Sequence, residues 1–295
     1  MWHSVIYLYL LSQIHLSLAE AVTNKNEQHS VDMFREYLRI DTSNPDNIDY
    51  AIDFLIRYVD ELGIPYEVYK PADKPILVAT IQGSDPSLPS IMLNSHIDVV
   101  ATDEWKYPPF EAYMDANGDI YARGSQDTKD VGIQYLEAIR KLKHDNITLL
   151  RTVHVTFMPD EETGGLKGMY EFVKTKEFKS LNIGFALDEG GTSPDNELYA
   201  IYAGRRSWDI EIKPIRARGA LDTQKLRNIG IPALGFSTKR NTVTRLHGKD
   251  EYQNVETFLN GIEIYKELIK NLANIPLYFF FSNQSLYIVK NKTHK

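Results

Sequence analysis

Hydrophobic residues recur along two N-terminal segments with the spacing of amphipathic helices. Residues 31–40 place Phe34 and Leu38 four positions apart, and residues 50–62 repeat apolar side chains at spacings of three and four. Further helices are predicted over residues 130–142, 168–174, 222–228 and 254–272. An amphipathic helix buries its apolar stripe against another element, so we expect these helices to pack on a sheet.

Short runs of β-prone residues alternate with these helices and predict strands. The runs cover residues 66–69, 76–81, 91–93, 151–158, 183–187, 198–202 and 208–212. Because strands and helices alternate along the chain, the sequence predicts an α/β fold with a mixed, mostly parallel sheet and helices on both faces. No internal repeat or low-complexity linker divides the pattern, which favours a single domain.

The two ends of the chain fall outside this alternation. Residues 1–21 form an apolar segment that is too short and too interrupted to span a membrane. Small residues near its end favour a cleaved signal peptide and a secreted protein, and the alternative is a disordered leader on a cytoplasmic protein. Residues 277–295 begin with an apolar, β-prone tail, expected to be an edge strand or an aggregation-prone segment.

Composition restricts the chemistry that the chain can perform. Hydrophobic residues make up 43% of the 295 residues and charged residues 25%, as in soluble folded proteins. The net charge of −7 includes no long basic run, which excludes a nucleic-acid-binding role. The cysteine count is 0, which excludes disulfides, thiol nucleophiles and thiolate metal sites. A metal ion would therefore be held by histidine and carboxylate side chains.

Acidic residues and a histidine lie at the ends of four predicted strands. Ligands of α/β sheets bind beyond the carboxyl ends of the strands, so side chains in these loops are expected to converge. They are His96, Asp98, Asp127, Asp160, Glu161, Glu162, Asp188 and Glu189. The two-residue spacing predicts that the Asp98 carboxylate supports the imidazole of His96, as is usual for a metal-bound histidine. Asp127 could bridge two cations, and the adjacent Glu161 and Glu162 could divide the roles of base and ligand.

Two histidines remain as candidate metal ligands once the others are considered. The others are His3, His15, His29 and His294 in a predicted leader or tail, His144 at a helix end, and His154 inside a strand. The strand position predicts a core or supporting role for His154. His96 and His247 remain, and the alternative for His247 is an exposed loop histidine without a function.

The order of these residues resembles the zinc amidohydrolase family that includes aminoacylase and carboxypeptidase G. The resemblance extends from about residue 30 to residue 276 and predicts a zinc-hydrolase catalytic domain of the phosphorylase/hydrolase-like fold. It is carried by the phrases Ser95-His-Ile-Asp-Val-Val, Pro109-Phe-Glu-Ala, Tyr121-Ala-Arg-Gly-Ser-Gln-Asp, Gln134-Tyr-Leu-Glu-Ala, Pro159-Asp-Glu-Glu, Gly184-Phe-Ala-Leu-Asp-Glu-Gly and Ile231-Pro-Ala-Leu-Gly-Phe-Ser.

The resemblance implies hydrolysis of N-acyl-L-amino acids, which are small-molecule substrates, with two zinc ions per chain. One ion would be held by His96, Asp127 and Glu189, and the other by Asp127, Glu162 and His247. Asp127 would bridge the ions. Glu161 would be the general base, and Asp98 would be the partner of His96. The same bimetallic chemistry serves peptide bonds, so a dipeptidase or carboxypeptidase is the alternative activity.

The resemblance also implies a missing segment. Members of the family carry an inserted lid domain, whereas this sequence passes at residues 215–216 directly into what resembles the return to the catalytic domain. We therefore expect an open site with impaired activity, and a monomer or a self-associating chain because the lid carries the family's dimer surface. A non-catalytic, metal-binding truncated isoform is the alternative.

Overall fold

The computed structural model describes residues 25–201 and 222–275. The predicted leader at 1–21, the strand at 208–212, the junction at 215–216 and the tail at 277–295 lie outside the described residues. The expectations attached to these four segments therefore stay predictions.

A mixed sheet forms the centre of the fold, and within the described residues it has seven strands in the order β1-β2-β6-β3-β7-β9-β8. The strands are β1 (Tyr66–Tyr69), β2 (Ile76–Ile81), β3 (Ser90–His96), β6 (Val153–Met158), β7 (Ile183–Asp188), β8 (Ala200–Ile201) and β9 (Ala233–Phe236). The central strands β6, β3, β7 and β9 pair in parallel, whereas β1, β2 and β8 add antiparallel pairs. The predicted mixed, mostly parallel sheet is confirmed.

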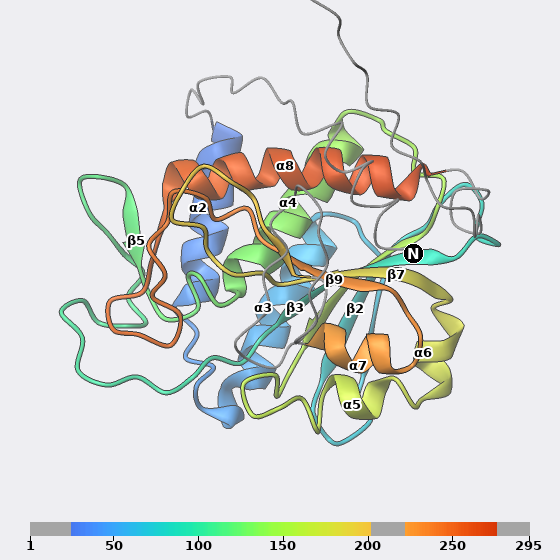
Figure 1. The fold of residues 1–295 in the computed structure, drawn as a ribbon, viewed down its shortest axis with the longest axis horizontal. Helices are drawn as coiled ribbons and strands as arrows, with labels where there is room; N and C mark the ends of the chain where they lie inside the picture. The colour runs from blue at the N-terminus through green and yellow to red at the C-terminus, as the bar shows by residue number, and fades with distance from the viewer. Residues whose placement is uncertain (1–24, 202–221, 276–295) are drawn as a thin grey trace, which may run out of the picture.

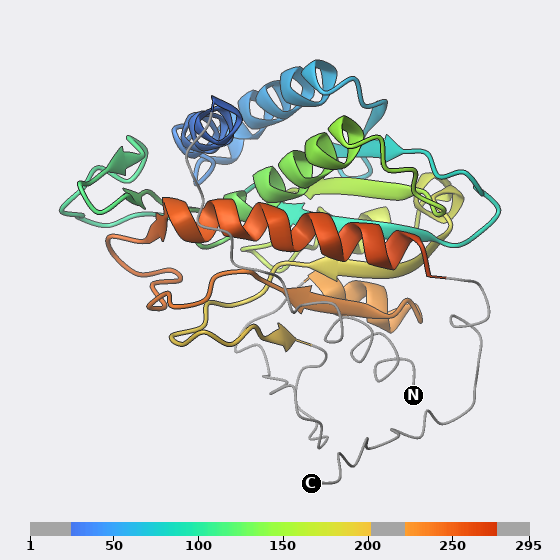
Figure 2. The ribbon, with the colours of Figure 1, turned by 90° about the horizontal axis from the view of Figure 1, so that it is seen from above.

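Helices cover both faces of this sheet (Figures 1 and 2). One face carries α2 (Lys25–Leu38), α3 (Ile48–Glu61), α4 (Lys129–His144) and α8 (Val255–Ala273). The other face carries the shorter helices α5 (Met169–Phe172), α6 (Lys176–Ser180) and α7 (Asp222–Asn228). A single turn of 3₁₀ helix, η1 (Pro45–Asn47), leads into α3.

The two-sided burial of the sheet follows from the side-chain alternation along its strands. In β2, Leu77 and Ala79 pack in the cluster beneath α2, α3, α4 and α8, whereas Ile76 and Val78 pack in the cluster beneath α5, α6 and α7. Both faces of β2 are covered, so its first four residues form a continuous apolar run. The bounds of β1, β2 and α7 agree with those predicted from the sequence.

A smaller sheet lies to one side of the main sheet (Figure 1). It contains β4 (Tyr113–Met114), β5 (Asp119–Tyr121) and β10 (Tyr252–Asn254) in the order β10-β5-β4. The pairing of β5 with β10 brings the segment before Asp127 beside the segment after His247. None of the helices within residues 25–201 and 222–275 is both long enough and apolar enough to cross a membrane.

Candidate metal centre

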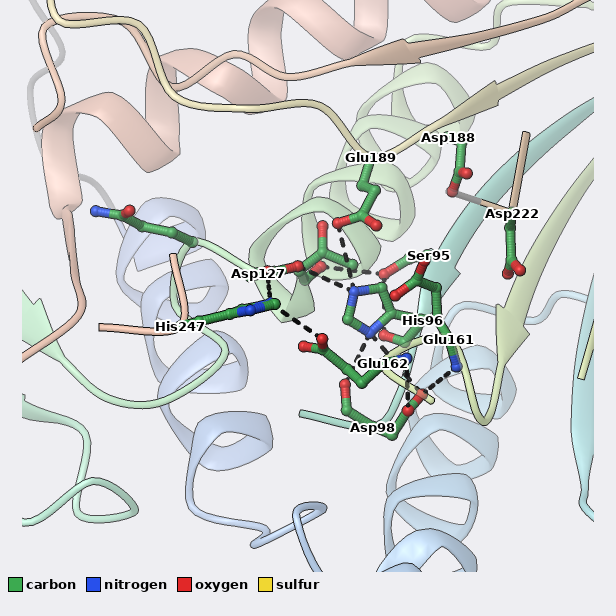
Figure 3. Close-up of polar contacts among 12 residues, drawn as sticks. Ser95, His96, Asp98, Asp127, Glu161, Glu162, Asp188, Glu189, Asp222 and His247 are labelled. Carbon is green, nitrogen blue, oxygen red and sulfur yellow. Dashed lines mark hydrogen bonds and ion pairs between the residues drawn. The ribbon is translucent and has the colours of Figure 1, made fainter. Parts of the chain in front are cut away.

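The candidate site lies where the chain reverses its direction of travel across the sheet. β3 lies between β6 and β7 in the sheet. The chain passes from β3 to β6 on one side and then from β6 to β7 on the other side of β3. Such a switch point opens a crevice beyond the carboxyl ends of the strands. His96 is the last residue of β3, Glu161 and Glu162 follow β6, and Glu189 follows β7 (Figure 3).

The five predicted ligands converge at this crevice around the carboxylate of Asp127 (Figure 3). The Nε2 atom of His96 lies 3.0 Å from Asp127 Oδ1 and 3.3 Å from Glu189 Oε2. The Nε2 atom of His247 lies 3.1 Å from Asp127 Oδ2 and 3.0 Å from Glu162 Oε2. Each oxygen of Asp127 therefore faces a different histidine.

The donor set fits a divalent metal ion. Nitrogen and oxygen atoms of His96, Glu161 and Glu189 lie within 4.8 Å of one another, as do those of His96, Asp127 and Glu162. Among the described residues, the buried Oε1 atoms of Glu161 and Glu162 have no hydrogen-bond partner, so these carboxylates keep acceptor capacity for a further ligand. Imidazole and carboxylate ligands suit zinc, and they also accept cobalt or manganese.

A backbone contact leaves the Nε2 atom of His96 available to a metal. Its Nδ1–H donates to the main-chain carbonyl of Asp98 at 2.7 Å, which fixes the proton of a neutral imidazole on Nδ1. The Asp98 carboxylate lies farther away, with Oδ1 at 3.9 Å from Nδ1. Asp98 thus contacts the ring through both groups, and the closer contact is made by its carbonyl.

The Asp98 carboxylate instead holds the loop that carries the two glutamates. Its Oδ1 accepts the backbone N–H of Glu161 and its Oδ2 accepts the backbone N–H of Glu162, each at 3.1 Å. Burial raises the pKa of Glu161 to about 8 and that of Glu162 to about 7 in the metal-free chain. Glu161 therefore combines a buried carboxylate with a fixed backbone.

Asp188 has a structural role in this region. Its Oδ1 accepts the amide of Asn94 at 2.9 Å, and its Oδ2 accepts the backbone N–H of Thr223 at 2.9 Å. Asn94 also donates to Asp222, at 3.2 Å. Asp188 thus joins the end of β7 to the start of α7. His154 is buried inside β6, which confirms its predicted place in the core.

The first turn of α4, directly after Asp127, is anchored by two buried charged side chains that the sequence did not single out. Lys129 Nζ donates to the carbonyls of Tyr37 at 3.1 Å and Ile40 at 2.6 Å. Asp130 accepts from Lys239 Nζ, at 2.9 Å for Oδ2 and 3.2 Å for Oδ1, and both side chains are fully buried.

Gln126 and Glu251 are also missed by sequence reasoning. Both are buried beside the Asp127 backbone. Polar residues in acidic loops are usually solvated, so neither spacing nor composition distinguishes them from surface residues.

Comparisons of the sequence with known proteins agree with this geometry. Residues 92–201 match Peptidase family M20/M25/M40. Aminoacylase-1 of Mus musculus is 44% identical over 227 residues, which are 73% of this chain and 55% of the mouse protein. Aminoacylase-1 of Homo sapiens is 45% identical over 193 residues, 64% of this chain and 47% of the human protein. The chain thus spans about half the length of the curated relatives it matches.

Solved structures share the fold at low sequence identity. A tripeptidase from Staphylococcus aureus superposes with a TM-score of 0.65 at 14% identity, covering 84% of this chain and 99% of that chain. The LapA aminopeptidase of Legionella pneumophila gives a TM-score of 0.60 at 16% identity, covering 93% of this chain and 75% of that chain. These likenesses show that the chain shares the fold of these proteins, and residues 92–201 match Peptidase family M20/M25/M40.

Proposed function

We propose that the chain is a zinc-dependent, aminoacylase-type amidohydrolase, which cleaves N-acyl-L-amino acids to a carboxylate and a free L-amino acid. The observation that carries the proposal is the Asp127 carboxylate, which faces His96 with one oxygen and His247 with the other, beside the buried Glu161. The similarity to aminoacylase-1 supports the choice of substrate class.

Two zinc ions would be held by the residues that surround Asp127. His96, Asp127 and Glu189 would hold one ion, and Asp127, Glu162 and His247 would hold the other. When bound, such a pair of ions polarises an amide carbonyl and lowers the pKa of a water molecule toward neutrality.

Glu161 would move the proton in this reaction. Its carboxylate accepts a proton from the attacking water, the new C–O bond forms, and the same proton passes to the amine nitrogen as the C–N bond breaks. The carboxylate has a free acceptor atom within the described structure, and its backbone is fixed by Asp98. Glu162 is the weaker candidate for the base, because its Oε2 already contacts His247.

A substrate panel tests the proposal. Metal-free protein is loaded with zinc and assayed with N-acetyl-L-amino acids, their D-enantiomers and unblocked dipeptides, with the Glu161→Gln variant as control. The proposal expects selective turnover of the N-acetyl-L-amino acids that Glu161→Gln abolishes. Turnover of dipeptides alone would show that the substrates are peptides and not N-acyl amino acids. Zinc binding without turnover of any amide would support the non-catalytic alternative.

A further inference from the structure

His247 makes its contacts from an exposed position. Its side chain is 57% accessible, and its backbone adopts a left-handed conformation with φ of 59°. It lies in the loop between β9 and β10, where six of the ten residues at 241–250 are exposed. A non-glycine residue in this conformation persists when surrounding structure holds it there. The anchor of His247 must therefore lie in contacts that hold the backbone of the loop around it.

The buried side chain of Gln126 supplies this anchor. Its Nε2 donates to the carbonyl of Val243 at 3.1 Å and to the carbonyl of Tyr252 at 2.8 Å. Its Oε1 accepts the backbone N–H of Arg245 at 2.9 Å. These three backbone groups lie on both sides of His247 in the sequence. One amide side chain thus closes the loop at its base and fixes the path of its backbone.

Glu251 makes the reciprocal contacts from that loop to the Asp127 segment. Its Oε1 accepts the backbone N–H groups of Gln126 at 2.6 Å and Asp127 at 3.2 Å. Its Oε2 accepts from Nη1 of Arg123 at 2.7 Å. The Glu251 side chain is fully buried. Its carboxylate thus fixes the backbone from which the Asp127 side chain extends.

Resting on the function proposed above, we propose that Gln126 and Glu251 are paired positioning residues of the metal centre. Each extends from one ligand-bearing segment and holds the backbone of the other, so Asp127 and His247 are set in place together. Glu251 fixes the backbone of Asp127, which faces both histidines, whereas Gln126 fixes only the loop of His247. The two residues should therefore affect metal binding differently.

Zinc titration of the metal-free chain distinguishes these effects. Affinity is measured by competition with a chromophoric chelator for wild type, Gln126→Ala and Glu251→Ala. Loss of a group that orients a ligand typically weakens metal binding about 10–100-fold. We expect this loss for both ions in Glu251→Ala and, in Gln126→Ala, for only the ion held by Asp127, Glu162 and His247. Glu251→Gln keeps an oxygen acceptor for both N–H groups and should restore much of the affinity.

Glu137 offers a matched control for the burial of a charged residue. It is a fully buried glutamate, and it accepts from Ser30, Tyr58 and Arg140, which join α2, α3 and α4. Its contacts do not include the ligand residues. Glu137→Ala should lower the melting temperature while leaving both zinc affinities at the wild-type value. Equal losses of zinc affinity in Glu137→Ala and Glu251→Ala would overturn the proposal.

Hydrogen exchange of the metal-free protein tests the same contacts without zinc. Peptides covering residues 241–252 should exchange faster in Gln126→Ala and Glu251→Ala, but not in Glu137→Ala. Unchanged exchange in the first two variants would overturn the positioning role. If the wild-type protein bound no zinc while both variants still exchanged faster, the metal-dependent function would be rejected. The role of Gln126 and Glu251 in holding the two backbones would then still stand.

Discussion

His154 makes the stability of the metal-free protein depend on pH. The residue lies in the middle of the sheet, where β6 pairs with Thr80 of β2 and Met92 of β3. Its side chain is buried, and its Nδ1 lies 2.9 Å from the hydroxyl of Thr80. Burial lowers the pKa of His154 from 6.5 to about 4, because the charged imidazolium is poorly solvated there.

The magnitude follows from this difference in pKa. Above pH 6.5 the imidazole is neutral in both the folded and the unfolded chain, so the full stability is present. Between pH 6.5 and 4 the unfolded chain binds a proton that the folded chain excludes, and the free energy of unfolding falls by about 1.4 kcal/mol per pH unit. The loss attributable to His154 between pH 6.5 and pH 5 is therefore about 2 kcal/mol.

Urea unfolding of the metal-free chain measures this loss. The free energy of unfolding is determined at pH 7 and pH 5 for wild type and His154→Gln, so the contributions of other titrating groups cancel in the difference. The variant should lose about 2 kcal/mol less than wild type over this interval. His144→Gln is the control, because it makes the same substitution at a side chain that is 82% exposed. Equal losses in wild type and His154→Gln would refute the reasoning.

Three further predictions concern the metal centre. Glu161→Gln should retain two zinc ions by elemental analysis and lose about 10²–10⁴ in turnover, because the amide cannot accept a proton. Asp127→Ala should instead lose zinc. The reverse pattern would contradict the roles given to these residues. Asp98→Ala should lower the free energy of unfolding by about 1–3 kcal/mol, since two backbone N–H groups lose their carboxylate acceptor, and an unchanged urea midpoint would contradict this. Zinc at 100 times its Kd should raise the free energy of unfolding by about 2.7 kcal/mol per site, and a chelator should reverse the rise in the same thermal or urea assay.

Local patterns were sufficient to predict the large elements and the polar residues that converge at the strand ends. β1 and β2 are short runs rich in β-branched and aromatic residues, so their bounds are recognised to the residue. His96 ends β3 and Glu189 follows β7, and parallel strands bring such strand-end residues to one edge of the sheet. The convergence of the ligands is therefore a consequence of topology that the sequence pattern already contains.

Contacts between distant loops are beyond the reach of such patterns. The strands β4, β5 and β10 are two or three residues long, too short for a side-chain period to emerge. The spacing of His96 and Asp98 predicts proximity but cannot distinguish the carbonyl from the carboxylate of Asp98. Gln126 and Glu251 gain their importance only when two loops far apart in the sequence meet.

The anchoring of the first turn of α4 limits how the protein can move. Sliding or rotating this helix would remove the buried ammonium of Lys129 from its two carbonyls and separate Asp130 from Lys239. Breaking one buried ion pair alone costs about 3–5 kcal/mol, so such a state is scarcely populated. A molecule that enters the crevice must therefore do so without movement of α4. Asp127, which directly precedes this turn, stays fixed to the frame of the sheet.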